Sequence, residues 1–158
     1  MLRTALVALL PLISSVCFAQ TEAVDIYSQD QLLDLIRSNQ YLAKVKQDDC
    51  QLVQDIEARA QVLKQPLYQF LWGEMLNHGT CVKANPAKGI ALLRDSAEQG
   101  SSEAMLKLAE YYQSGKFVIR NKDRAVHYLL PAAASGDLTA RMTLVRLFSE
   151  GDGSSRDY

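Results

Sequence analysis

Three glycines, Gly79, Gly115 and Gly151, divide the second half of the chain into equal intervals of 36 residues. A fixed period of this length is typical of stacked repeats, in which each unit buries its apolar face against its neighbours. Other positions keep the same offset: Glu74 with Glu110, Asn85 with Asn121, Leu93 with Leu129, Ala97 with Ala133, and Gly100 with Gly136. The chain is therefore expected to form an array of similar units.

Each unit is predicted to contain two helices. Pro66 suits a first helical position, and Gly79 suits a left-handed helix stop. Asn85 is a good N-cap for the second helix, which Gly100 ends. The expected helices are residues 49–63, 66–77, 86–98, 102–113, 122–134 and 138–149. The predicted fold class is all-α, a helical repeat solenoid preceded by an N-terminal helical cap.

Residues 20–64 are assigned to that cap because they carry helix-start signals of their own. Ser28 and Gln31 form a capping box that predicts a short helix. Asp48 and Gln51 form a second capping box, which is expected to open the longer helix over 49–63. Cys50 would then lie in the first turn of that helix.

The first 19 residues have the pattern of a signal peptide. Arg3 precedes an apolar run from Ala5 to Val16 that is too short to span a bilayer. Cleavage after Ala19 would release an exported protein. Lipidation at Cys17 is the alternative, although Val16 is larger than the residue usually found before a lipidated cysteine. No later run is long enough for a membrane span in the mature chain.

Export leaves two cysteines, Cys50 and Cys81, in a compartment that favours oxidation. A disulfide between them would close a loop of 31 residues and stabilise the fold by roughly 3 to 4 kcal/mol. A redox-active or metal-binding thiol pair is the alternative. The chain has no CxxC spacing, and this favours the structural bond.

Composition and motifs argue against catalysis. The 17 Lys and Arg residues nearly balance 18 Asp and Glu, so no basic excess indicates nucleic-acid binding. Of the two histidines, His78 lies near a helix end, where an imidazolium complements the helix dipole, and His127 lies on a different helix with no acid or thiol at a nucleophile-like spacing. No phosphate-binding loop, Gly-x-Ser-x-Gly or His-Glu-x-x-His is present. We expect no catalytic residues, no cofactor, no metal site and no enzyme activity.

Four aromatic residues are candidates for partner binding: Trp72, Tyr111, Tyr112 and Tyr128. Large amphipathic rings often anchor protein interfaces. The same residues recur at helical spacing, which is equally typical of core positions. Both interpretations are open at this point.

The repeats resemble the Sel-one-like repeat, a short relative of the tetratricopeptide repeat. Unit two carries its pattern at Ala104, Leu108-Ala109, Tyr112, Gly115, Val118, Ala125, Tyr128, Ala132-Ala133 and Gly136. The units are residues 65–100, 101–136 and a partial 137–158, which is either a fragment or a capping helix. Unit one has Tyr68 and Gly89 where alanines are usual, so its helices are expected to pack more loosely.

The export signal, the residues around Cys50 and Cys81, and the repeats together resemble the MotX family, periplasmic accessory proteins of the sodium-driven polar flagellar motor. The resemblance implies a non-enzymatic scaffold in a basal-body ring beneath the outer membrane. Its implied partners are a MotY-like ring protein and the stator subunit, and the family normally continues into further helices. The alternative is an exported repeat protein with a host-contact or penicillin-binding enzymatic role. Proteins of that kind carry a cysteine pair in nearly every repeat, unlike units two and three here.

Overall fold

The structure is a computed structural model that describes residues 26–150. These residues form helices joined by turns, with no strand among them, which confirms the all-α solenoid. The predicted signal peptide and residues 151–158 of the third unit lie outside the described residues. The helices are α1 (Gln29–Arg37), α2 (Tyr41–Gln47), α3 (Val53–Gln61), α4 (Pro66–His78), α5 (Pro86–Glu98), α6 (Ser102–Ser114), α7 (Lys122–Ala134) and α8 (Leu138–Ser149).

Helices α4 to α8 agree with the sequence prediction to within one residue at each end. The reason is that their caps form as expected. The side chains of Asn85 and Asn121 accept hydrogen bonds from the amide of the third helical residue, at 3.1 and 2.9 Å. Gly79 and Gly115 end the first helix of each unit with φ of +64° and +77°, a region that disfavours other residues.

The N-terminal cap differs from its prediction at the second helix start. The capping box of Ser28 and Gln31 forms and opens α1. Asp48, however, ends α2, a helix that the sequence analysis did not identify. The Asp48 carboxylate is engaged by Tyr27 Oη and Lys44 Nζ, each at 2.6 Å, so it does not cap a following helix. Helix α3 therefore begins at Val53 rather than near residue 49.

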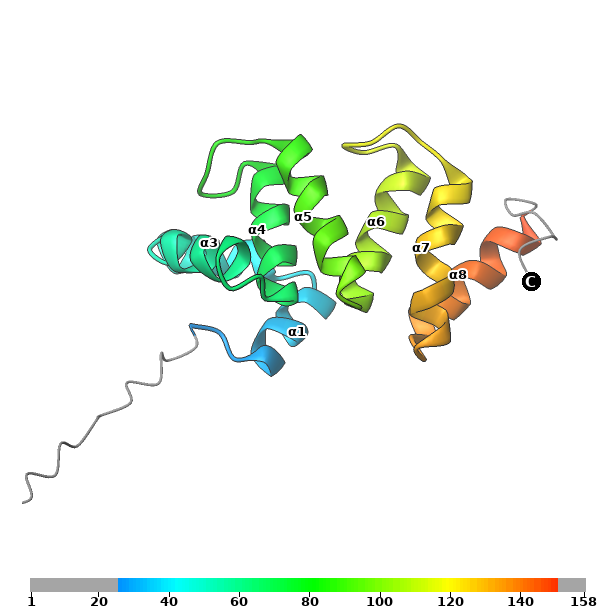
Figure 1. Ribbon diagram of the computed structural model, residues 1–158, viewed down its shortest axis with the longest axis horizontal. Coiled ribbons are helices and arrows are strands. Elements are labelled where there is room, and N and C mark those ends of the chain that lie inside the picture. The colour runs from blue at the N-terminus through cyan, green and yellow to red at the C-terminus, as the bar shows by residue number, and fades with distance from the viewer. Residues whose placement is uncertain (1–25, 151–158) are drawn as a thin grey trace, which may run out of the picture.

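The helices lie side by side in chain order from α4 to α8 (Figure 1). Helices α4 and α5 form one antiparallel pair, and α6 and α7 form the next. The cap packs against the outer side of the first pair, where α1, α2 and α3 all contact α4. As a result, every residue of α4 from Tyr68 to Asn77 is buried. Among residues 26–150, no helix is both long and apolar enough to cross a membrane.

Unit one is packed more closely than its sequence suggested. Gly73 of α4 and Gly89 of α5 face each other where the two helices cross. A Cβ added at Gly89 would lie 2.6 Å from the Gly73 carbonyl oxygen and would also overlap the Asn77 side chain. The expectation of looser packing is therefore wrong. The missing side chains let the two backbones approach, because no Cβ separates them.

Candidate functional site

The predicted disulfide is present and joins the cap to unit one. Cys50 lies in the turn between α2 and α3, and Cys81 lies in the loop between α4 and α5. Their Cα atoms are 5.6 Å apart. Both residues have positive φ, +58° and +60°, so each sits in a tight turn rather than in a helix. The bond thus connects the turn between α2 and α3 in the cap to the loop between α4 and α5 in unit one.

A buried carboxylate lies where the cap meets the two complete units. Glu74 is fully buried and accepts hydrogen bonds from Tyr41 Oη at 2.8 Å, Tyr111 Oη at 2.7 Å and Asn77 Nδ2 at 3.0 Å. These donors belong to α2, α6 and α4, so one side chain ties together the cap and both complete units. Burial and the Glu74 charge raise the pKa of both tyrosines well above the usual value, which keeps them protonated as donors.

His78 borders this carboxylate at the end of α4. Its Nε2 lies 3.6 Å from Glu74 Oε2 and 3.3 Å from Tyr111 Oη, and its ring meets Phe117 edge-on. Burial lowers the pKa of His78 below its ordinary value, although the Glu74 charge acts in the opposite direction. His78 and Glu74 thus both contact the Tyr111 hydroxyl, and the Phe117 ring lies against His78. Within the described chain, no three His, Cys, Asp or Glu side chains are grouped to hold a metal.

The structure corrects the partner-binding assignment for three of the four aromatic candidates. Trp72, Tyr111 and Tyr112 are only 4%, 1% and 3% exposed, because the paired helices enclose them. They are core residues, which is the alternative that helical spacing left open. Tyr128 is half-buried. It alone remains a candidate for contact with a partner.

Tyr128 belongs to an arginine–tyrosine cluster that comprises Arg94, Tyr112, Arg124 and Tyr128. The two rings stack with centroids 5.9 Å apart. Arg94 Nη2 and Arg124 Nη1 both donate to Tyr112 Oη, at 2.9 and 3.3 Å. Burial raises the pKa of Tyr112, but the two guanidinium groups outweigh it and the net shift is downward. The repeat pattern indicates neither arginine, because the next unit has Leu130 in place of Arg94 and the previous unit has Lys88 in place of Arg124.

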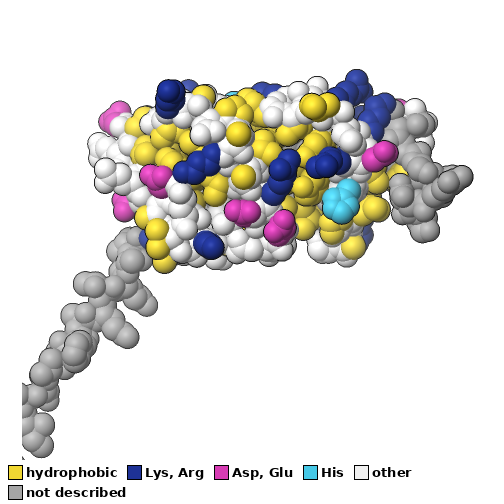
Figure 2. Space-filling model, turned by 45° about the horizontal axis from the view of Figure 1, so that its top comes forward, with side chains coloured by type: hydrophobic (Ala, Val, Ile, Leu, Met, Phe, Trp, Pro, Cys, Tyr) yellow, Lys and Arg dark blue, Asp and Glu magenta, His cyan; other side chains and the backbone are white. Residues whose placement is uncertain are grey.

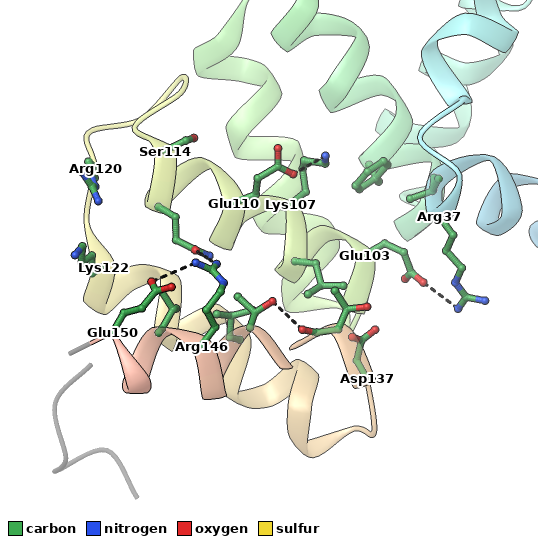
Figure 3. A pocket seen from close by; sticks show the side chains of 18 residues that line it. Arg37, Glu103, Lys107, Glu110, Ser114, Arg120, Lys122, Asp137, Arg146 and Glu150 are labelled. Atoms are coloured by element: carbon green, nitrogen blue, oxygen red, sulfur yellow. Dashed lines mark hydrogen bonds and ion pairs between the residues drawn. The ribbon is translucent and has the colours of Figure 1, made fainter. Parts of the chain in front are cut away.

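A hollow of about 850 Å³ opens between α1, α6 and α8, and Figure 3 shows charged side chains around it. Most of these charges are already paired with one another. The pairs are Arg37 with Glu103 at 3.2 Å, Lys107 with Glu110 at 2.8 Å, and Arg146 with Glu150 at 3.4 Å. The hollow therefore offers a mixed polar surface without a strong preference for one sign of charge.

A cap followed by stacked antiparallel helical pairs is the architecture of a helical repeat protein, here of the Sel1 class. The Sel1 repeat family matches residues 66–101 and 102–137. A Sel1 repeat protein from Oxalobacter formigenes superposes with a TM-score of 0.55 at 28% identity, over 62% of this chain and 40% of that one. A protective antigen of uropathogenic Escherichia coli strains, displaying an SLR fold, has a TM-score of 0.58 at 21% identity, over 77% and 28% respectively.

A curated relative is much closer in sequence. The sodium-type polar flagellar protein MotX of Vibrio parahaemolyticus is 38% identical over 162 aligned residues. The alignment covers 99% of this chain and 77% of that protein. The chain belongs to the MotX family.

Proposed function

We propose that the protein is a non-enzymatic assembly factor of the polar flagellar motor, which helps to retain the sodium-driven stator for rotation. The observation that carries the proposal is the similarity to a sodium-type flagellar protein along 99% of the chain. The proposed location is the periplasm, in a basal-body ring beneath the outer membrane. The proposed partners are a MotY-like ring protein and the stator subunit.

The architecture suits a protein that works by binding. Stacked helical pairs form an extended surface, and each pair contacts only its neighbours, so the surface is long relative to the core. The Cys50–Cys81 bond and the Glu74 hydrogen bonds fix the cap on the first pair. A rigid support of this kind can hold other proteins at a set spacing without turning over a substrate.

The test is deletion of the gene in the polar-flagellated bacterium that encodes the chain. Cells without the protein should assemble flagella that do not rotate when a sodium gradient is applied. The intact gene should restore rotation, whereas a version that lacks residues 2–19 should not, because it would not reach the periplasm.

Stator retention has its own measurement. A fluorescent stator subunit should lose its polar focus in the deletion strain and regain it on complementation. Normal sodium-driven swimming of the deletion strain would contradict the proposed function. Polar stator foci in non-rotating cells would contradict retention in particular.

A further inference from the structure

The arginine–tyrosine cluster has more hydrogen-bond donors than acceptors. A guanidinium group only donates, and Tyr112 Oη already accepts from Arg94 and Arg124. Arg94 Nε is buried and has no hydrogen-bond partner. The Tyr112 hydroxyl has no acceptor for its own proton among the hydrogen bonds of residues 26–150. Buried donors without acceptors are unfavourable, so an added acceptor would stabilise the cluster.

The cluster also has more positive than negative charge. Neither Arg94 nor Arg124 forms an ion pair within the described residues. Residues 79–94 and 115–127, which surround it, contain a single acid, Asp123, and Asp95 follows directly after Arg94. The basic residues of the two segments are Lys83, Lys88, Arg94, Lys116, Arg120, Lys122 and Arg124.

Helix ends of both kinds meet at this end of the molecule. The N-termini of α5 and α7 lie beside the C-termini of α4 and α6, so the helix dipoles largely offset one another and the side chains set the local charge. Figure 2 turns this end toward the viewer and shows Lys and Arg side chains over apolar and polar surface, with Asp and Glu side chains among them. The excess of basic residues in the two segments would attract an acidic partner before it makes close contact.

The repeat fold does not require the cluster. The position equivalent to Arg94 in the next unit is Leu130, and the position equivalent to Arg124 in the previous unit is Lys88. Among the described residues, only the place where α5, α6 and α7 meet therefore combines two arginines with stacked tyrosines. The repeat pattern does not specify the arginine–tyrosine cluster, and the buried Arg94 Nε in it has no hydrogen-bond partner. Binding of a partner explains these two properties better than packing does.

We propose that the arginine–tyrosine cluster binds a carboxylate side chain from an acidic segment of a protein partner. The planar guanidinium group matches a carboxylate in a bidentate arrangement, and two of them converge here. The tyrosine rings provide an apolar floor that excludes water and strengthens the ion pairs. This inference rests on the proposed function, in which the protein acts by holding other proteins, and it specifies the chemistry of one partner.

The test uses the purified protein with its disulfide intact and a hexaglutamate peptide as the probe. Nuclear magnetic resonance of the arginine Nε–Hε groups follows each guanidinium separately. The signals of Arg94 and Arg124 should shift and saturate with hexaglutamate and should not respond to hexaglutamine. The double variant R94Q/R124Q should bind hexaglutamate at least about tenfold more weakly, since two charge-assisted contacts are lost.

The control variant K83Q/K88Q removes the same charge from exposed lysines on the same face. It should weaken binding by less than about threefold, because only the long-range field changes. Equal losses in the two double variants would overturn the proposal, as would shifts confined to other arginines. Tighter binding of inorganic phosphate at the same signals would also overturn it, in favour of a phosphate ligand. If R94Q/R124Q does not fold, R124Q alone gives the same comparison, because Arg124 is exposed.

The outcome is separable from that of the proposed function. Binding is measured on the purified protein, so its failure would leave the motor role standing. Conversely, normal swimming of the deletion strain would contradict the motor role and leave a demonstrated carboxylate site unaffected.

Discussion

Glu74 and Glu110 occupy the same position in successive repeats, yet their surroundings differ completely. Glu74 is fully buried and receives hydrogen bonds from three side chains, two of them contributed by α2 and α6. The Glu110 side chain is 61% exposed and pairs only with Lys107 of its own helix. The difference arises because the cap packs mainly on α4 of unit one, where Glu74 lies. A repeat position therefore acquires its role from the elements that pack on it.

This pair allows a matched test of buried hydrogen bonding. Glu74→Gln keeps the side-chain size but removes the charge that three donors share, so it should lower the free energy of unfolding by about 2 kcal/mol. Glu110→Gln should change the stability by less than about 0.5 kcal/mol, as is usual for an exposed site. Urea unfolding followed by circular dichroism measures both. An E74Q protein as stable as the wild type would show that these hydrogen bonds only offset the cost of burying the carboxylate.

His78 gives the molecule a pH dependence of predictable sign. Burial lowers its pKa below 6.5, so the folded state binds a proton less readily than the unfolded chain does. Its contribution to stability is therefore present above the unfolded-state pKa of about 6.5 and is lost as the pH falls from there through the lower folded-state pKa. His78→Gln should reduce the drop in melting temperature between pH 7 and pH 5.5. His127→Gln, at an exposed position of α7, is the control and should leave the drop unchanged.

At the scale of helices, the sequence was informative wherever a helix carries its own start and stop. The helices α4 to α8 were predicted almost to the residue because prolines, asparagines and glycines mark their ends. Helix α2 was missed because no side chain caps its first turn. The start of α3 was misplaced because Asp48 bonds to Tyr27, which is distant in sequence. Contacts with residues distant in sequence set the bounds of α2 and α3, and a local sequence pattern carries no information on such contacts.

The same limit applied to the candidate site. The disulfide followed from two cysteines and an export signal, whereas the cluster around Arg94 needed the neighbouring helix α7 to be in place. The four aromatic candidates stand out in the sequence, but their spacing fits a core position as well as a surface position. Burial depends on which faces the helices turn to one another, and three of the four proved to be enclosed.

The crossing of α4 and α5 gives a test at this scale. Gly89→Ala would place a methyl group against the Gly73 carbonyl and the Asn77 side chain. Overpacking of this kind should destabilise the protein by about 1 to 3 kcal/mol, despite the better helix propensity of alanine. Ala91→Ser, on the exposed side of the same helix, should have an effect below about 0.5 kcal/mol. A thermally stabilised G89A protein would show that the helices can separate without cost.

Across the whole molecule, packing decreases from the cap toward α8. One apolar core extends from Tyr27 to Tyr111, and a smaller one lies between α6 and α8. Helix α4 is enclosed on all sides, whereas α8 exposes Leu138, Met142 and Val145 along one face. The disulfide and the Glu74 hydrogen bonds all lie at the cap end. Stability in a repeat array is carried by such neighbour contacts, so it should be unequal along the chain.

Hydrogen exchange can measure this inequality directly. Amides of α8 should exchange at least about a hundredfold faster than those of α4, with α6 between them because it contributes to both cores. Reduction of the Cys50–Cys81 bond should speed exchange in α3 and in the α4–α5 loop, where the cap is attached, and leave α8 unchanged, because α8 packs on α6 and α7. Uniform protection from α4 to α8, or equal acceleration everywhere after reduction, would instead mean that the described chain unfolds as a single cooperative unit.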